Sequence, residues 1–185
     1  GIITTEGFRD VLEMRRRDRP STWGLWGQFT PVIERKCRLE VPERTLANGT
    51  VVKDVDEASI KAAAQDLIAQ GCESVCLFFI NGYANTDNET KAARILRQVW
   101  PNDYVSVATE ILPEIREFER CSTASLNAYL QPVVANYLAR LETRIAEDEA
   151  GSEILIVQSN GGIMSVDTAK ALPVRTALSG PAAGV

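Results

Sequence analysis

The sequence predicts an α/β fold, in which helices flank a mostly parallel sheet and a β-hairpin adds to it. Helix-like and strand-like segments alternate from residue 56 to residue 108. The run from Val75 to Ile80 is apolar throughout, which is typical of a strand covered on both faces. Residues 122–148 carry apolar side chains at steps of three and four, which indicates a long helix with one buried stripe. This alternation favours parallel strands joined by helices.

Composition places the chain among ordinary globular proteins. Its 185 residues can bury one good core or the halves of two, and 45% of them are apolar and 24% charged. The net charge of −5 argues against nucleic acid as a partner, because such binding depends on phosphate neutralisation by Lys and Arg. No apolar run approaches the ~20 residues that span a bilayer, so we expect no membrane partner, and no stretch resembles a signal peptide. Four clustered arginines are the local exception, as a solvated arm or an anion contact: Arg15, Arg16, Arg17 and Arg19.

The histidine and cysteine counts restrict the chemistry further. Histidine is absent, which excludes a His-bearing zinc site and a Ser-His-Asp triad within this chain. The four cysteines contain no Cys-x-x-Cys pair, so we expect no metal site, and buried free thiols in a reducing, cytoplasmic compartment. Cys121 is also weighed as a nucleophile, although no histidine stands near it to activate it.

The first third of the chain predicts a strand, an aromatic loop and a hairpin. Residues 1–5 are typical of a strand and residues 8–14 of a helical turn. Polar and apolar residues alternate from Val32 to Leu46, which indicates a strand with one solvent-exposed face. Asn48-Gly49 is the strongest short signal for a hairpin turn. Three aromatic residues either line a ligand-binding site or anchor a loop to a hydrophobic core: Trp23, Trp26 and Phe29.

Helix signals recur through the middle of the chain. A helix is expected from Glu57 to Gln70, with Asp54 or Asp56 as its N-cap and Gly71 at its end. A second helix, capped by Thr86 or Asp87, should run to Val99, and a strand should follow from Tyr104 to Ala108.

The long helix is expected from Ser122 to Asp148. Pro132 would clash with the carbonyl of residue 128, so we expect a kink there, or two helices with Pro132 opening the second. A strand at 153–157, a short helix at 164–171 and a final strand at 174–178 should follow. The buried stripe of the long helix is expected to contain Leu126, Leu130, Val133, Val134, Tyr137, Leu141 and Ile145.

These segments predict three regions. Residues 1–120 form the interior part of a first lobe, with a β arm and hairpin at 1–55 and an α/β unit at 56–120. Residues 121–150 form a long connecting helix, and residues 151–185 start a second lobe. The chain starts inside a strand-like segment and stops where a helix would begin, so we expect it to be a piece of a longer polypeptide.

Two strand ends carry small residues where backbone N–H groups can approach an anion near a helix start. The first is Ser159-Asn160-Gly161-Gly162, and the second begins at Ser179-Gly180. Double glycine also makes ordinary tight turns, so this pattern alone is weak. Neither stretch is a Walker A loop, because no Gly-Lys-Ser/Thr follows.

An acidic stretch precedes the long helix. Glu–Arg spacings of three and four allow pairs on a solvated helix surface, which are worth only tenths of a kcal/mol. Alternatively, Glu119 and Arg120 stand beside the hydroxyls of Ser122 and Thr123, where a carbonyl or phosphate group can be held. The other members of the stretch are Glu110, Glu114, Arg116 and Glu117.

Five motifs occur in order along essentially the whole chain: Thr4-Thr5-Glu6-Gly7-Phe8-Arg9-Asp10-Val11, Gly82-Tyr83-Ala84-Asn85, Leu112-Pro113-Glu114-Ile115-Arg116-Glu117-Phe118-Glu119-Arg120, Gln158-Ser159-Asn160-Gly161-Gly162 and Leu178-Ser179-Gly180-Pro181-Ala182-Ala183-Gly184-Val185. Together, in this order and spacing, they resemble the hydantoinase A/5-oxoprolinase family. The resemblance implies a two-lobed ATPase fold of the actin/Hsp70/sugar-kinase type.

The same resemblance implies an enzyme that depends on ATP and Mg²⁺. Phosphorylation of the carbonyl oxygen of a cyclic amide or imide, such as a hydantoin or 5-oxoproline, would let water open the ring, while the protein positions the groups and stabilises charge. The family's two Asp-x-Gly-Gly-Thr phosphate loops are expected just before Gly1 and just after Val185. Since neither lies in the chain, we expect the chain alone to be inactive.

Residue roles are carried over position by position. Glu119 and Arg120 match the catalytic part of the family's Glu-Arg-x-Ser-Thr segment, and Ser122 and Thr123 match its substrate-binding part. Cys121 stands where a threonine is usual, and Asn81, Gly82, Thr86 and Asn88 stand where relatives commonly carry histidine and proline, which puts the exact substrate in doubt. The residues matched to nucleotide-binding loops are Asn160, Gly161, Gly162, Ser179 and Gly180.

Two alternative functions stay open: an ATPase subunit of an acetone or acetophenone carboxylase, and a non-catalytic assembly domain. Relatives often pair with a hydantoinase B-like subunit, so such a partner is expected for the parent protein. Apolar surfaces that meet the rest of the parent also predict a homodimer of the isolated chain.

Overall fold

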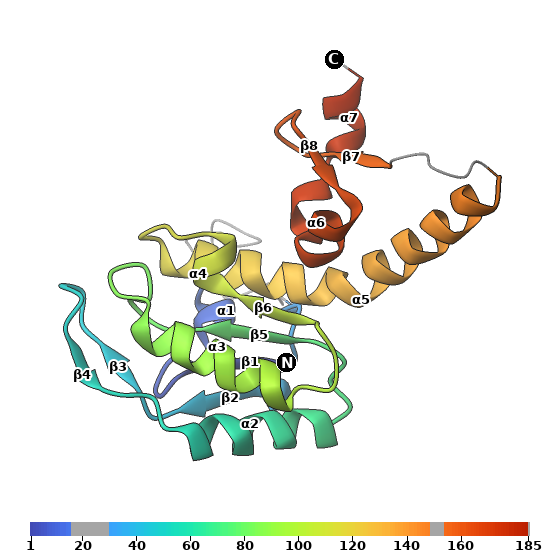
Figure 1. Cartoon of the computed structure of the whole chain (residues 1–185). Coiled ribbons are helices and arrows are strands. Elements are labelled where there is room, and N and C mark those ends of the chain that lie inside the picture. Colours follow the sequence, from blue (N-terminus) through green and yellow to red (C-terminus); the bar gives the residue numbers. More distant parts are fainter. Residues whose placement is uncertain (16–29, 149–153, 185) are drawn as a thin grey trace. The chain divides into compact units, whose positions relative to one another are not determined.

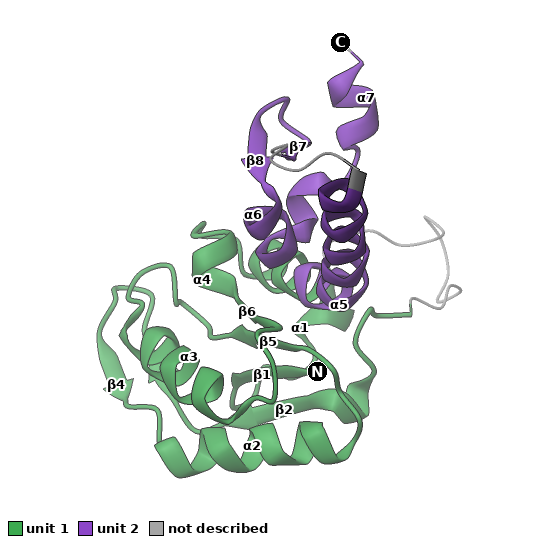
Figure 2. Cartoon of the chain, turned by 45° about the vertical axis from the view of Figure 1, so that its right-hand side comes forward, with its two compact units in different colours: residues 1–125 green, residues 126–185 purple. Residues whose placement is uncertain are grey.

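The computed structural model describes residues 1–15, 30–148 and 154–184. Contacts divide the chain into two compact units, residues 1–125 and 126–185 (Figure 2). Three of the clustered arginines and all three aromatic residues of the predicted loop lie outside the described residues: Arg16, Arg17, Arg19, Trp23, Trp26 and Phe29.

The first unit is built on a four-stranded sheet with the order β2-β1-β5-β6, and every pairing in it is parallel. Ile3 of the central strand β1 pairs with Leu39 on one side and with Leu77 on the other. The sheet confirms the predicted fold class. The strands are β1 (Ile2–Thr5), β2 (Arg38–Val41), β5 (Val75–Phe78) and β6 (Val105–Val107).

Two helices lie side by side over one face of this sheet, namely α2 (Glu57–Ala69) and α3 (Asp87–Val99) (Figure 1). Asp56 caps α2, since its carboxylate accepts a hydrogen bond of 2.9 Å from the N–H of Ser59. Gly71 follows α2 with a φ of 81°, the left-handed conformation expected after a helix. The core between helices and sheet includes Ile3, Ile60, Leu67, Leu77, Leu96 and Val107.

The predicted hairpin is also present. It joins β3 (Arg44–Thr45) to β4 (Val51–Lys53), and Gly49 takes the positive φ of 84° that its turn requires. Short helical segments complete the unit: α1 (Val11–Met14), the 3-10 helix η1 (Arg35–Cys37) and α4 (Ala108–Ile111).

The long helix α5 spans Glu117–Asp148 and contains Pro132. It is one helix, so the alternative of two separate helices is wrong. The predicted stripe is also partly wrong, because three of its members are exposed: Leu126, Val133 and Tyr137. The side chains that are buried instead belong to Cys121, Ala124, Ser125, Asn127, Ala128, Gln131, Ala135 and Leu138.

The second unit packs the rest of α5 against a small antiparallel hairpin and short helices. Its core contains Leu138, Met164, Val166 and Ala169. The predicted final strand at 174–178 is wrong, because that segment begins as the 3-10 helix η2. The elements of this unit after α5 are β7 (Leu155–Val157), β8 (Ile163–Ser165), α6 (Val166–Ala171), η2 (Pro173–Thr176) and α7 (Ser179–Ala183).

Of the helices that the structure describes, none combines the length and apolarity that a membrane crossing requires. The cytoplasmic location, the homodimer and the predicted region boundaries at residues 120 and 150 stay predictions.

Candidate functional site

The loops that follow neighbouring strands meet at the carboxyl edge of the first unit's sheet. Asn81 and Gly82 follow β5, and α4 follows β6 directly. In open parallel sheets, ligands bind outside the carboxyl ends of the strands, where such loops converge. This edge is therefore the candidate site. The buried side chains of Glu89 and Arg120 and the half-buried Glu117 form a polar group there, called the carboxyl-edge cluster below.

Glu89 holds the ends of two strands together. It lies in the first turn of α3 and its side chain has an exposed fraction of 0%. Its Oε2 accepts a hydrogen bond of 2.9 Å from the N–H of Phe79, after β5, and its Oε1 accepts one of 2.7 Å from the N–H of Thr109, after β6. Burial raises the pKa of the Glu89 carboxyl, although the charge of Arg120 and these two N–H groups act in the opposite direction.

Arg120 supplies the positive charge of the cluster, and it is as fully buried as Glu89. Its Nη2 lies 3.4 Å from Oε2 of Glu89, and its Nη1 lies 2.8 Å from Oε2 of Glu117. Nη1 also donates a hydrogen bond of 3.2 Å to the carbonyl of Phe79. One guanidinium thus connects the first turns of α3 and α5 to the end of β5, with two carboxylates to balance its charge.

The loop after β5 fits closely against this ion pair. A Cβ atom at Gly82 would lie 2.7 Å from Oε2 of Glu89 and 2.8 Å from Nη2 of Arg120, closer than side chains approach. The Arg120 guanidinium carbon also lies 5.3 Å from the centre of the Phe78 ring, within range of a cation–π attraction. A side chain at position 82 would therefore have to displace the ion-paired ends of Glu89 and Arg120.

Asn81 turns the chain at this point. Its φ of 59° is a left-handed conformation that asparagine adopts more readily than most residues. Its N–H donates a hydrogen bond of 2.8 Å to Oε1 of Glu117, and its side-chain Nδ2 donates one of 2.9 Å to the carbonyl of Thr45 in β3. The loop is thereby fastened to α5 on one side and to the hairpin on the other, with the Tyr83 ring 5.9 Å from the Arg120 guanidinium.

A second buried carboxyl, Glu43, lies just after β2 and faces no ion-pair partner at hydrogen-bond distance among the described residues. The hydroxyl of Thr5 donates to its Oε1, and Nδ2 of Asn88 donates to its Oε2 at 2.8 Å. The Thr5 hydroxyl also accepts a hydrogen bond of 3.0 Å from the N–H of Ile80. Burial raises the pKa of Glu43, while the two donors and the charge of Arg44 act against it.

The predicted site residues of the first unit divide into two groups. Arg120 is buried and paired, as described above. Glu119, Ser122 and Thr123 are half-buried, and their spacing of three and four places them on a common face of α5. The roles predicted for these four residues stay predictions.

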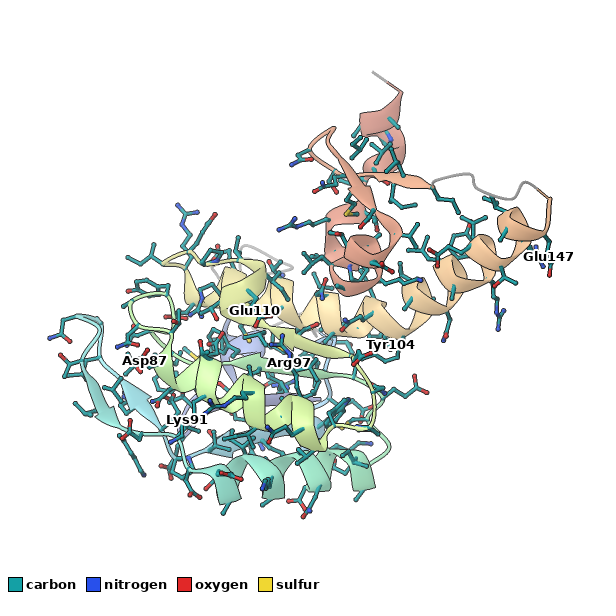
Figure 3. The ribbon with its side chains drawn as sticks, in the orientation of Figure 1. Asp87, Lys91, Arg97, Tyr104, Glu110 and Glu147 are labelled. Carbon is teal, nitrogen blue, oxygen red and sulfur yellow. The ribbon has the colours of Figure 1, made fainter. Side chains whose placement is uncertain are left out.

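The acidic stretch contains one buried and one surface ion pair. Arg120 pairs with Glu117 three residues earlier, as the helical spacing predicts, but this pair is part of the buried cluster. Glu110 pairs with Arg97 of α3 instead, through two hydrogen bonds of 3.0 and 2.6 Å at the surface (Figure 3).

Sequence analysis missed Glu89 and Glu43. A usable signal existed for Glu89, because it shares one helical face with Ala92, Ala93 and Leu96, which are buried in the core. An acidic residue on a buried stripe is costly without a partner, so it points to a buried cation or hydrogen-bond donor nearby. Glu43 carries no comparable signal, because it lies in a short connection between β2 and β3.

The stretch Ser159-Asn160-Gly161-Gly162 is the turn between β7 and β8, so β8 separates it from the predicted helix, which begins at Val166. Gly161 has a φ of 83°, and Gly162 donates its N–H to Oδ1 of Asn160 at 3.0 Å. The N–H groups of Gln158, Ser159 and Gly161 are also bonded to carbonyls within this unit. An anion at this turn would therefore have to be held by other amides or by side chains.

Ser159 connects the turn to the start of the last helix. Its hydroxyl donates to the carbonyl of Arg175 at 2.8 Å and also contacts the carbonyl of Ala177. Ser179 begins α7, directly after Leu178 with its positive φ of 63°, and Gly180 is exposed. The structure thus brings the Ser159 turn close to the segment before Ser179, and the nucleotide-binding role of both stays a prediction.

Two further expectations concern cysteine and metal. Cys121 is buried, which raises the pKa of its thiol well above the usual value and keeps it protonated. Cys121 therefore has the properties of a structural thiol. Within residues 1–15, 30–148 and 154–184, no three His, Cys, Asp or Glu side chains come together as a metal site.

Family models and known proteins match the chain over nearly its whole length. The model described as hydantoinase/oxoprolinase N-terminal region matches residues 1–100, and the hydantoinase/oxoprolinase model matches residues 120–185. Caprolactamase subunit alpha of Pseudomonas jessenii is 30% identical over 185 residues, covering 98% of this chain and 27% of that protein. The crystal structure of the ATP-dependent caprolactamase from the same organism superposes with a TM-score of 0.82 and 28% identity, covering 96% of this chain and 27% of that one.

Two other relatives carry different activities in their names. The 5-oxoprolinase of Saccharomyces cerevisiae is 33% identical over 210 residues, covering 100% of this chain and 16% of that protein. The acetophenone carboxylase gamma subunit of Aromatoleum aromaticum is 25% identical over 202 residues, covering 100% of this chain and 27% of that subunit. The chain therefore spans 27% or less of the length of these relatives.

Proposed function

Because the chain belongs to the hydantoinase/oxoprolinase family, we propose that it forms one part of an ATP-dependent enzyme that opens a cyclic amide or imide. The observation that supports this proposal is the family match at residues 1–100 and 120–185. Two relatives are named for caprolactam and 5-oxoproline, which are both cyclic amides. A hydantoin or a 5-oxoproline-like ring is the proposed substrate of the parent protein.

ATP, when bound, would supply a phosphoryl group to the amide carbonyl oxygen, with Mg²⁺ as its counter-ion. Among the described residues, no three metal ligands come together. We propose that the family's Asp-x-Gly-Gly-Thr phosphate loops contribute to the ATP–Mg²⁺ site of the parent protein. The proposed contribution of this chain to nucleotide binding is the Ser159–Gly162 turn together with Ser179 and Gly180.

The proposed substrate face is on α5. Glu119, Ser122 and Thr123 share one half-buried face, where hydroxyls can hold a carbonyl and a carboxylate can accept or deliver a proton. Arg120 has an exposed fraction of 0% and is held by Glu89 and Glu117, so we assign it a positioning role rather than contact with substrate. It fixes the first turn of α5, on which the substrate face begins.

The experiment that tests this function uses the parent polypeptide with ATP and each of three substrates: 5-oxoproline, a hydantoin and a lactam. We expect ring opening that requires ATP and is lost in Glu119→Ala. We also expect the isolated chain to hydrolyse neither ATP nor these rings, because its sequence contains no Asp-x-Gly-Gly-Thr phosphate loop. Turnover by the isolated chain above its own Glu119→Ala control would overturn that expectation.

A second candidate function is the ATPase subunit of a ketone carboxylase. The match to the acetophenone carboxylase gamma subunit covers 100% of this chain, which supports this candidate at lower identity. Assay of the parent complex with bicarbonate and a ketone, against the cyclic amides, separates the two. The names of two relatives describe them as subunits, so a partner subunit, proposed to be hydantoinase B-like, should co-purify with the parent. A parent that turns over none of these substrates would favour the non-catalytic assembly domain.

A further inference from the structure

Two cysteines of the first unit lie near each other at the edge of its core. Cys37 is the last residue of η1, immediately before β2, and Cys72 follows the Gly71 turn at the end of α2. Both side chains pack against the hydrophobic core between the sheet and its two helices, and both stay partly exposed. The Cys37 thiol donates a hydrogen bond of 3.6 Å to Oε1 of Gln70, two residues before Cys72, and the Cys72 thiol lies beside it.

The position of this pair in the fold favours a covalent link. Helix α2 packs along the edge strand β2, so its end and the start of that strand are held together by the core between them (Figure 1). Neighbouring thiols on elements that are packed together need little backbone movement to reach disulfide geometry. Partial exposure lets a small oxidant reach them.

We propose that Cys37 and Cys72 form a site of reversible thiol oxidation, at which a low-molecular-weight disulfide such as glutathione disulfide converts the pair into an intramolecular disulfide. One thiolate of the pair attacks a sulfur of glutathione disulfide, and the glutathione thiolate that leaves takes up a proton. The second thiol then loses its proton, attacks the mixed disulfide and expels the second glutathione. Two protein thiols are oxidised to one disulfide, and one glutathione disulfide is reduced to two thiols.

The chain carries its own comparison pair. Cys76 and Cys121 are also near each other, but both are buried, and burial raises the pKa of Cys76 to about 12. Their protonated thiols are shielded from an oxidant in solution. Oxidation should therefore be confined to the exposed pair. Burial and the neighbouring thiol also raise the pKa of Cys37, so the reaction should accelerate as the pH rises.

The test is intact-mass analysis of the folded 185-residue chain after incubation with glutathione disulfide. We expect the loss of the mass of two hydrogen atoms, reversal by dithiothreitol, and one cross-linked peptide pair that contains Cys37 and Cys72. Cys37→Ser and Cys72→Ser should each abolish this loss and instead retain one glutathione on the remaining thiol of the pair.

The matched control is the double variant Cys76→Ala/Cys121→Ala, checked for folding by circular dichroism, or the wild-type peptide map if that variant does not fold. Both should show the same Cys37–Cys72 link as the wild type. The proposal is overturned if the folded wild type stays fully reduced, if it accumulates glutathione on both thiols without closing the disulfide, or if the link involves Cys76 or Cys121.

Discussion

Glu89 of α3 and Arg120 of α5 form an ion pair in which both side chains have an exposed fraction of 0%, with Nη2 of Arg120 3.4 Å from Oε2 of Glu89. Such a pair offsets its desolvation cost only when further hydrogen bonds satisfy both groups. Glu89 obtains them from two backbone N–H groups, and Arg120 obtains them at Nη1 from Glu117 and a backbone carbonyl, while its Nε has no hydrogen-bond partner among the described residues. The pair therefore organises the carboxyl edge of the sheet, on which the proposed substrate face depends.

Removing one charge of this pair should be costly. We expect Glu89→Gln to lower the free energy of unfolding by about 3 kcal/mol, because Arg120 would lose a buried counter-charge. Urea denaturation followed by circular dichroism measures the change. As the control, Glu57→Gln breaks an exposed pair with Lys61 and should leave the midpoint nearly unchanged. Equal changes in the free energy of unfolding would show that the buried pair contributes no more to stability than the exposed pair.

Gly82 should tolerate no side chain. We expect Gly82→Ala to destabilise the first unit by about 2 kcal/mol, since its Cβ would press on both Glu89 and Arg120. Gly180→Ala is the matched control, because nothing lies within 4 Å of the Cβ it would add and its φ is not positive. Thermal unfolding of both variants decides the point, and a Gly82→Ala midpoint at the wild-type value would mean that the loop relaxes freely.

The ionisation of Glu43 should contribute to the pH dependence of the free energy of unfolding. Burial raises its pKa in the folded state above the usual 4.5, so the folded protein binds this proton more readily than the unfolded chain does. The contribution of Glu43 is then fully present below pH 4.5 and is lost as the pH rises through its folded-state pKa.

We therefore expect the free energy of unfolding to fall less steeply with pH in Glu43→Gln than in the wild type, because the amide keeps the neutral state at every pH. Urea denaturation at about one-unit steps from about pH 4 to about pH 8 measures the two slopes. Parallel slopes would mean that Glu43 ionises alike in the folded and unfolded states.

Much of the first unit could be predicted because its signals are local. The apolar run at Val75–Phe78, the Asp56 cap and the Asn48-Gly49 turn each depend on residues adjacent in sequence, and each is present in the structure. The face of α5 could not be predicted in the same way. Its buried side includes Asn127, whose amide is satisfied by hydrogen bonds to Ala171 and Val174, far away in sequence.

In the candidate site, too, local features could be predicted and contacts between distant residues could not. Glu119, Arg120, Ser122 and Thr123 were found from a contiguous motif. Their supporting partners lie elsewhere along the chain: Glu89 is 31 residues from Arg120. Arg120 is fully buried, whereas Glu119, Ser122 and Thr123 are half-buried. Its buried counter-charge comes from that distant carboxylate, so no local pattern predicted the pair.

The most direct measurement is the steady-state kinetics of ATP-dependent ring opening by the parent polypeptide that contains this chain, with Glu119→Gln and Arg120→Lys compared with the wild type. If Glu119 contacts the substrate, Glu119→Gln should lower kcat by about 100-fold or more while its urea midpoint stays at the wild-type value. If Arg120 positions this face, Arg120→Lys should lower both kcat and the midpoint. An unchanged kcat in Glu119→Gln with every cyclic amide, or an Arg120→Lys variant that loses activity with an unchanged midpoint, would contradict this division of roles.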